Sequence, residues 1–315
     1  MKRLDDAQFS PPSSNTGGKS PPGQSSTCHV DALAFSFKNE GFSAHDLPAF
    51  SCMLSRFFPE FRASPASRGW MGFRSTAEFN IGGFVAFGGE SQRGRVYVSL
   101  MGVACSLCTD WPGLAAWLEE TGARISRVDL AHDDLEGKNY TVDHALLDYQ
   151  QGGFNSGGSP ASHKFISSGE HGKRCARTLN VGRRENGKMV RIYEKGQQLG
   201  DCVHPDWVRV EVELRAKDRI IPYDALVNPA AYLAGAYPAL AWISKLTQAI
   251  KTCRKVIEKT LDQYAAWAHQ QVGRVVHALA VFHGGDFFAV IDRIKRHELP
   301  RRLLGAHSLL SPIGT

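Results

Sequence analysis

Alternating apolar and polar residues predict β-strands along most of the chain between residues 28 and 220. The clearest runs are Val30–Phe37, Glu78–Phe87, Arg95–Met101, Arg124–Asp133, Thr178–Gly182, Met189–Tyr193 and Val208–Arg215. Asn186–Gly187 stands between two of these runs, and this dipeptide is typical of a tight β-hairpin turn. Two short amphipathic helices are predicted at Pro112–Thr121 and Asp143–Gln150. The pattern therefore predicts a mixed α+β domain rich in hairpins.

The two ends of the chain have a different character. Residues 1–27 are rich in Pro, Ser, Gly and Asn, a composition that predicts a disordered tail. From Leu246 to Phe282 the apolar residues follow a helical period, and Gly284–Gly285 then ends the helix. Asp286 is placed to cap the next helix. We expect a tail over 1–27, an α+β domain over 28–220, and an α-helical DNA-binding or accessory domain over 221–315.

Charge is concentrated in one part of the chain. The net charge is +6, and residues 173–219 contribute +5 of it, with 12 Lys/Arg against 7 Asp/Glu. A basic segment of this kind favours a polyanionic partner such as DNA. Residues 225–244 carry no charge, but Asn228, Pro229 and Pro238 interrupt the run, so it predicts buried helices and no membrane span. We therefore expect a soluble cytoplasmic protein without a membrane partner.

Three carboxylates fall on the faces of two predicted strands. Because side chains alternate along a strand, Arg127 and Asp129 share one face while Val128 and Leu130 share the other. The same alternation places Glu211 and Glu213 on one face of the strand Val208–Arg215. If these strands are neighbours, the three carboxylates converge, and their oxygen atoms suit Mg²⁺ or Mn²⁺. The alternative is a set of ion pairs with the interleaved arginines.

Tyr193 is the candidate nucleophile. Arg191 and Lys195 are predicted on the same strand face as Tyr193, where their charges would favour the phenolate over a phenol whose ordinary pKa is near 10. A phenolate among cations, close to metal-binding carboxylates, can attack a phosphodiester. The alternative is a tyrosine that only packs in the sheet.

Other cations are candidate DNA contacts. Arg183, Arg184 and Lys188 lie at the predicted hairpin turn. Lys251, Lys255 and Lys259 form an i, i+4, i+8 stripe on the predicted C-terminal helix. The alternative for this stripe is a solvated helix face.

The order of these elements resembles a known family. Arg127–Val–Asp129, then Arg191–Ile–Tyr193–Glu–Lys195–Gly196, then Arg209–Val–Glu211–Val–Glu213 resemble the replication initiation factors of rolling-circle plasmids and filamentous phages, a group that includes relaxases of some integrative elements. The resemblance implies a palm-like antiparallel sheet flanked by helices. It also implies that Tyr193 is the nicking tyrosine and that Asp129 and Glu211 occupy acidic strand positions, with Glu213 a further acidic candidate.

The function that this resemblance implies is origin-specific nicking that starts rolling-circle replication. Tyr193 would form a 5′-phosphotyrosine and release a 3′-OH primer, with Mg²⁺ or Mn²⁺ as cofactor. The expected partners are origin DNA, hairpin or single-stranded at the nick, and a host helicase and polymerase; a homodimer is left open. Two alternatives remain: a non-catalytic DNA-binding replication or repressor protein, and a conjugative relaxase.

Overall fold

The structure is a computed structural model that describes residues 28–155, 160–168, 176–217, 219–244 and 261–296. The chain divides into two compact units between Cys253 and Arg254. The predicted tail over 1–27 lies outside the described residues, and so does the lysine stripe of residues 251, 255 and 259. The boundary predicted at residue 220 falls inside the first unit, because the helices that follow it pack on the sheet.

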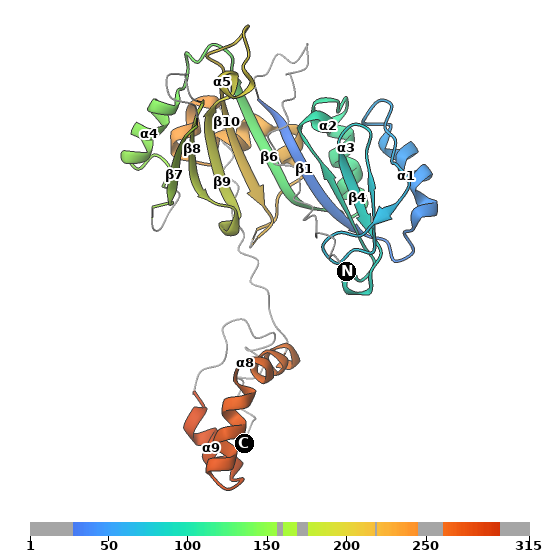
Figure 1. Cartoon of the computed structure of the whole chain (residues 1–315), viewed down its shortest axis with the longest axis vertical. Helices are drawn as coiled ribbons and strands as arrows, with labels where there is room; N and C mark the ends of the chain where they lie inside the picture. The colour runs from blue at the N-terminus through green and yellow to red at the C-terminus, as the bar shows by residue number, and fades with distance from the viewer. Residues whose placement is uncertain (1–27, 156–159, 169–175, 218, 245–260, 297–315) are drawn as a thin grey trace, which may run out of the picture. The chain divides into compact units, whose positions relative to one another are not determined.

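The described strands of the first unit form one ten-stranded sheet, in the order β2-β3-β4-β5-β1-β6-β10-β9-β8-β7 (Figure 1). Every neighbouring pair is antiparallel. The strands are β1 (Cys28–Lys38), β2 (Ser67–Arg68), β3 (Ser75–Glu78), β4 (Gly83–Phe87), β5 (Arg95–Leu100), β6 (Arg124–Asp134), β7 (His163–Ser168), β8 (Ala176–Arg183), β9 (Lys188–Glu194) and β10 (Val208–Arg215). The predicted antiparallel α+β class is therefore confirmed.

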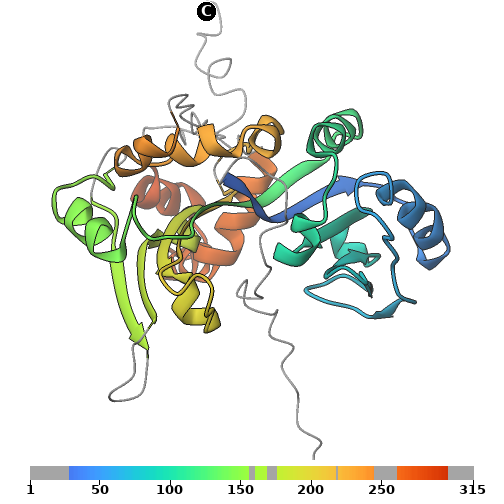
Figure 2. The same cartoon turned by 90° about the horizontal axis from the view of Figure 1, so that it is seen from above.

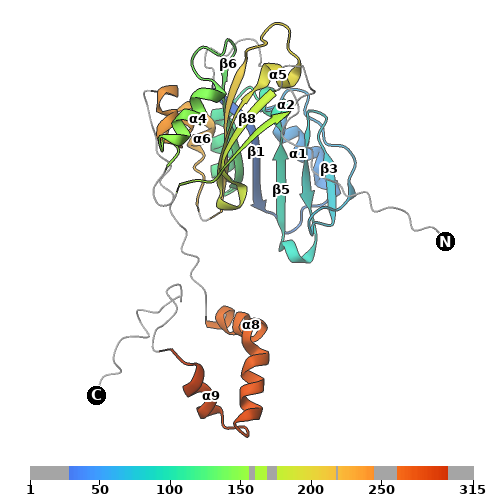
Figure 3. The same ribbon diagram turned by 60° about the vertical axis from the view of Figure 1, so that its left-hand side comes forward.

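The sheet consists of two halves with the same strand order. In the first half β1 is followed by a helix and by strands that return until β5 pairs with β1. In the second half β6 is followed by a helix and by strands that return until β10 pairs with β6. The two leading strands, β1 and β6, pair with each other at the centre of the sheet, and Figure 3 shows β1 beside β5. The halves therefore meet as two similar sub-sheets.

One face of the sheet, the core face, packs against helices. Val190, Val212, Leu130 and Val30 form a continuous apolar row across β9, β10, β6 and β1, and all four are buried. The helices of the first unit are α1 (Leu47–Leu54), α2 (Gly102–Ser106), α3 (Trp111–Glu120), α4 (Val142–Gln150), α5 (Lys195–Leu199), α6 (Asp224–Val227) and α7 (Pro229–Ala234). Helix α7 contacts β6 and β1, and the orange helices lie along one side of the sheet in Figure 2. Burial of these apolar side chains is the main stabilising term of the fold.

Most predicted strands are present, with two differences. Within the run Glu78–Phe87 only Gly83–Phe87 forms a new strand, β4, and Glu78 ends β3; a turn separates them, where Gly82 and Gly83 adopt φ values of 96° and 105°. Strand β9 ends at Glu194, and Lys195 begins α5, so Lys195 is not on the strand with Tyr193 as predicted. The hairpin at Asn186–Gly187 is confirmed, with Gly187 at φ 75°.

The second unit contains α8 (Leu261–Phe282) and α9 (Phe287–Ile294). The predicted cap is present, since the Asp286 carboxylate accepts hydrogen bonds from the backbone N–H groups of Phe288 and Ala289 at 2.9 and 3.2 Å. None of the helices in the described residues is long and apolar enough to span a bilayer.

A buried ionic cluster ties the two halves together. Arg209 on β10 is 2% exposed and donates to Asp133 on β6 and to Asp31 on β1, at 2.6 Å each. The Trp207 indole N–H donates to Asp133 at 2.7 Å. Burial alone would raise the pKa of Asp31, but the nearby His29 and the Arg209 charge outweigh it and lower this pKa to about 2.

Removing the cation from this cluster should destabilise the first unit. We expect Arg209→Ala to lower the free energy of unfolding by about 3–5 kcal/mol, because two buried carboxylates lose their partner. Arg62→Ala, at an exposed arginine, is the matched control and should change it by less than about 0.5 kcal/mol. Urea denaturation followed by circular dichroism measures both.

The same variant should change the pH dependence of stability. The pKa of Asp31 is lower in the folded protein than in the unfolded chain, so the ionised carboxylate stabilises the folded protein at pH values above the unfolded pKa. This contribution is lost as pH falls from about 4 towards 2. Wild-type stability should therefore fall over that range more steeply than that of Arg209→Ala. Equal slopes, or an unfolding free energy unchanged by the substitution, would contradict this role for the cluster.

Candidate functional site

The face of the sheet opposite the core face carries the candidate site, and we call it the charged face. Glu213 on β10 lies directly opposite Asp129 on β6, so these two strands are neighbours, as the sequence analysis required. On the other side of β10, Arg191 lies opposite Glu211 and Tyr193 lies opposite Arg209. Cross-strand partners point to the same side of a sheet. Three adjacent strands therefore bring the predicted tyrosine, arginine and carboxylates to one face.

Tyr193 is buried on the charged face. Its side chain is 5% exposed, and its hydroxyl donates to Glu211 Oε2 at 3.3 Å. Burial raises the pKa of Tyr193 well above its ordinary value, and the Glu211 charge raises it further. Arg209 and Arg191 act in the opposite direction and do not outweigh these effects. The expectation that nearby cations favour a phenolate is therefore wrong for this arrangement: the phenol is held in its protonated form.

Glu211 joins Tyr193 to Arg191. The carboxylate is 1% exposed; one oxygen accepts from the tyrosine and the other pairs with the Arg191 guanidinium. Arg191 thus fixes the rotamer of the carboxylate that faces the phenol. A carboxylate held in hydrogen-bonding distance of a hydroxyl has the geometry of a general base.

Lys195 approaches Tyr193 from α5. Its Nζ lies 5.7 Å from the centre of the Tyr193 ring and 5.9 Å from that of Trp207. Burial lowers the pKa of Lys195, and the neighbouring Arg209 lowers it further. The predicted proximity of Lys195 and Tyr193 is present, although a helix start rather than a strand face creates it.

Asp129 and Glu213 lie in an arginine network. The Asp129 carboxylate, 0% exposed, accepts from Arg127 Nε at 2.8 Å, and Arg127 also lies 3.6 Å from Glu213. Arg184 and Arg215 donate to the two oxygens of Glu213 at 2.9 and 2.5 Å. Burial raises the pKa of Asp129, and the negative charges of Glu211 and Glu213 raise it further. Arg127 lowers it but does not outweigh them, and this pKa is about 7. These contacts are the ion pairs that the sequence left open as an alternative.

A metal ion on these carboxylates stays a prediction. Asp129, Glu211 and Glu213 have suitable donor atoms and share a face, but each is engaged by a guanidinium. Among the described residues there is no group of three or more His, Cys, Asp or Glu arranged to hold a metal ion. The described arrangement therefore does not present a formed metal centre.

The candidate DNA contacts separate into different environments. Arg184 is paired with Glu213, and Arg183 Nε donates to the Ser162 hydroxyl at 3.2 Å. Lys188 is turned away from the charged face: its Nζ donates to the Ala236 carbonyl at 2.7 Å and lies 3.9 Å from the centre of the Tyr237 ring. Burial lowers the pKa of Lys188 to about 8. The prediction that Lys188 contacts DNA therefore finds no support in its position.

Sequence reasoning missed the partners of Arg209. Asp31 and Asp133 are far from Arg209 in the chain, and only the strand order β1-β6-β10 brings them together. One signal was available: Asp133 lies four residues after Asp129 on the same strand, and an even spacing places both side chains on the same face. The hydrogen bond from Tyr193 to Glu211 was also missed, because it depends on the register of β9 on β10.

Comparisons with known proteins agree with this fold. Residues 123–294, more than half of the chain, match the family described as replication initiation factor. Among solved structures, a rolling circle replication initiator protein from Geobacillus stearothermophilus has a similar fold, with a TM-score of 0.50 and 24% identity, covering 66% of this chain and 81% of that chain. A search of curated proteins found no match. The family match spans β6 to α9 and thus contains Asp129, Tyr193 and Glu211. This chain belongs to the replication initiation factor family.

Proposed function

We propose that this protein is an origin-specific DNA nickase that initiates rolling-circle replication, with Tyr193 as the nucleophile. Membership of the replication initiation factor family supports initiation, and the fold shared with a rolling circle replication initiator protein supports the rolling-circle type. The single observation that carries the chemistry is the hydrogen bond from Tyr193 to Glu211, whose other oxygen Arg191 holds.

In the proposed step Glu211 acts as the general base. The phenol proton passes to Glu211 as the Tyr193 oxygen attacks the scissile phosphorus, so an O–P bond forms and the bond from phosphorus to the 3′ oxygen breaks. The 3′ oxygen leaves and takes up a proton from solvent. The products are a 5′-phosphotyrosine and a 3′-OH primer. A positioned base is needed because the buried phenol does not ionise by itself near neutral pH.

The arginines give the site its affinity for phosphate. The three carboxylates are at most 1% exposed, whereas the side chains of Arg127, Arg184 and Arg215 are 25%, 47% and 40% exposed. The surface that faces solvent is therefore made of guanidinium groups, which bind phosphate oxygens. Arg191, 14% exposed and next to the phenol, is placed to neutralise charge on the attacked phosphate. Because Tyr193 is 5% exposed, the side chains over it must move when DNA binds.

A divalent ion, Mg²⁺ or Mn²⁺, is a further component of the proposal. Asp129, Glu213 and the Glu211 oxygen that now pairs with Arg191 would hold it, so that ion binding would replace guanidinium contacts while the other Glu211 oxygen stays beside the phenol. When bound, the ion would polarise the scissile phosphate.

The proposed partners follow from the reaction. The attacked strand must be accessible, so the origin DNA would be single-stranded or extruded as a hairpin at the nick. In the cytoplasm of the host, a host polymerase would extend the 3′-OH and a host helicase would unwind the duplex ahead of it.

A second candidate is a DNA-binding replication protein without nicking activity. The raised pKa of Tyr193 and the arginine-paired carboxylates favour it, since both are typical of a structural ionic network. The two candidates differ in one measurable respect, a covalent protein–DNA adduct.

Loss of the phenol oxygen should abolish nicking. We expect Tyr193→Phe to give no relaxed circle and no covalent adduct on supercoiled origin DNA, with DNA affinity within a few-fold of wild type. Tyr232→Phe, which removes a phenol hydroxyl hydrogen-bonded to Asp224 among the helices of the core face, is the matched control and should nick normally. An adduct formed by Tyr193→Phe would assign the reaction to another residue.

Loss of the base should change both the rate and its pH dependence. We expect Glu211→Gln to slow nicking by about 10²–10⁴-fold at pH 7.5, because the amide cannot accept the phenol proton. The residual rate should rise about tenfold per pH unit, since only the ionised fraction of a phenol with a raised pKa can attack. Glu194→Gln, next in sequence to Tyr193 but opposite Val208 on the core side, is the control. A Glu211→Gln rate and pH profile equal to wild type would remove Glu211 from the mechanism.

Metal binding should follow the protonation of Asp129. With the pKa of Asp129 raised to about 7, Mn²⁺ affinity measured by electron paramagnetic resonance should fall as pH drops below 7 and level off above it. Asp129→Asn should remove the binding. Nicking that persists unchanged in a chelator would show that these carboxylates serve as ion-pair partners of the arginines and not as metal ligands for the reaction.

A further inference from the structure

A second cationic region lies on the first half of the sheet, outside the tyrosine site. A groove of about 1300 Å³ is bordered by the end of β1, the start of β5, the loop Gly88–Gly94 and the start of β6. Its lining carries Lys38, Arg74, Arg93, Arg95 and Arg124 against Glu40 and Glu90, a net excess of three positive charges. Nearly all of this region precedes residue 123, where the family match begins.

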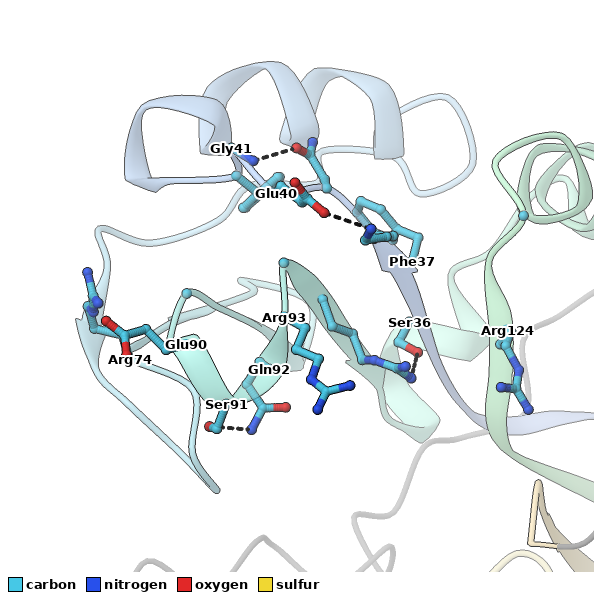
Figure 4. A pocket seen from close by; sticks show the side chains of 18 residues that line it. Ser36, Phe37, Glu40, Gly41, Arg74, Glu90, Ser91, Gln92, Arg93 and Arg124 are labelled. Carbon is cyan, nitrogen blue, oxygen red and sulfur yellow. Dashed lines mark hydrogen bonds and ion pairs between the residues drawn. The ribbon is translucent and has the colours of Figure 1, made fainter. Parts of the chain in front are cut away.

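The arginines of this groove are available to a ligand. Arg74, Arg93, Arg95 and Arg124 are all exposed, and within the described residues none of them forms an ion pair; Lys38 is paired with Glu40. Arg93 adopts φ 50°, a left-handed conformation that costs a non-glycine residue about 1 kcal/mol. Figure 4 shows the Arg93 and Arg124 side chains among the residues that line the groove, with Ser36 between them in this view. The groove thus presents guanidinium groups without carboxylate partners.

Four aromatic rings gather beside the groove, and we call them the aromatic cluster: Trp70, Phe73, Phe84 and Tyr97. The Trp70 ring centre lies 4.9 Å from that of Phe84 and 5.5 Å from that of Tyr97, and Phe73 lies 6.2 Å from Tyr97. All four side chains keep part of their surface exposed.

Strand register places the cluster, the groove and the tyrosine site on one face. Tyr97 lies opposite Ser36, which lies opposite Arg124, and Arg95 is two residues before Tyr97 on β5. Another row runs from Phe84 through Ser99 and Ala34 to Arg127. Neighbouring strands lie about 4.8 Å apart, so Phe84 and Arg127 are about 14 Å apart across the sheet. Only the small side chains Ser99 and Ala34 stand between them in this row.

From this arrangement we infer that the aromatic cluster and the arginine groove together bind single-stranded DNA. Surfaces that bind single strands combine cations along the backbone with aromatic rings on which bases stack. A duplex offers phosphates but no exposed base faces, so the aromatic cluster favours a single strand. The inference rests on the proposed function, which supplies single-stranded DNA at the nick. This DNA would run from the tyrosine site across β6, β1 and β5.

Two sets of substitutions test the two components separately. Binding of a fluorescent 20-nucleotide dT oligomer and of a 20-base-pair duplex is measured by anisotropy with the full chain, in both wild-type and Tyr193→Phe backgrounds, without metal. Nicking is not needed for this measurement, so failure of the nickase proposal would leave its result unaffected.

The cationic component is tested by Arg74→Gln, Arg93→Gln and Arg124→Gln combined. We expect at least a tenfold loss of dT affinity, and a slope of log K against log salt that is shallower by about 2, from three phosphate contacts. The control removes the same charge elsewhere, with Arg56→Gln, Arg62→Gln and Lys138→Gln, and should leave dT affinity within about twofold.

The aromatic component is tested by Trp70→Leu and Trp70→Phe. We expect Trp70→Leu to weaken dT binding by about 5- to 150-fold, the range for one lost base stack, with duplex affinity unchanged. Trp70→Phe keeps an aromatic ring and should restore most of the affinity, which a purely structural role for Trp70 does not require. Thermal melts show that each variant is folded.

Two results would overturn the inference. One is dT affinity unchanged in both the triple variant and Trp70→Leu. The other is a triple variant that loses dT and duplex binding equally while Trp70→Leu loses neither, which would make the groove a duplex backbone site.

Discussion

The burial of carboxylates on the charged face is the constraint on which the rest of the site depends. Asp129, Glu211 and Glu213 are at most 1% exposed, and a buried charge is tolerated only with a partner. Arginines from β6, β9, β10 and the β8–β9 turn supply those partners. Because the guanidinium groups lie outermost, a face with an acidic interior presents a cationic surface, which suits DNA. Burial and the Glu211 charge likewise raise the pKa of Tyr193 more than the arginines lower it, so the phenol stays protonated beside Glu211.

The two halves of the sheet show how one strand order can carry different chemistry. At the centre of the sheet, the charged-face positions Ala32 and Ala34 of β1 lie opposite Asp129 and Arg127 of β6. The second half thus concentrates ionisable groups, while the first half carries small side chains, aromatic rings and peripheral arginines. With reactive groups in one half and a binding surface in the other, a single continuous face of the sheet would both hold a DNA strand and cut it.

Alternation along the chain was sufficient to predict β6, β9 and β10 and the face of each that carries charge. Asn186–Gly187 identified the β8–β9 hairpin, although the loop is a 3-10 turn over Arg184–Asn186 in which, of the two residues, Gly187 alone takes the left-handed conformation. What alternation could not provide was register. The contacts of Glu211 with Arg191 and Tyr193 depend on the register of β9 on β10, and the contact of Arg209 with Asp31 depends on two strands distant in sequence. The burial of Tyr193 could not be predicted from alternation either, and this burial outweighs the expected effect of the cations on its pKa.

The most direct test of the account is to locate the covalent bond to DNA. The protein would be incubated with a single-stranded origin oligonucleotide whose short 5′-side fragment dissociates after cleavage and so cannot religate, digested, and analysed by mass spectrometry. The account predicts a nucleotide adduct on the peptide that contains Tyr193, joined through a 5′-phosphate. An adduct on any other residue would contradict the assignment of Tyr193. A cut strand with no adduct would contradict the proposed transesterification itself.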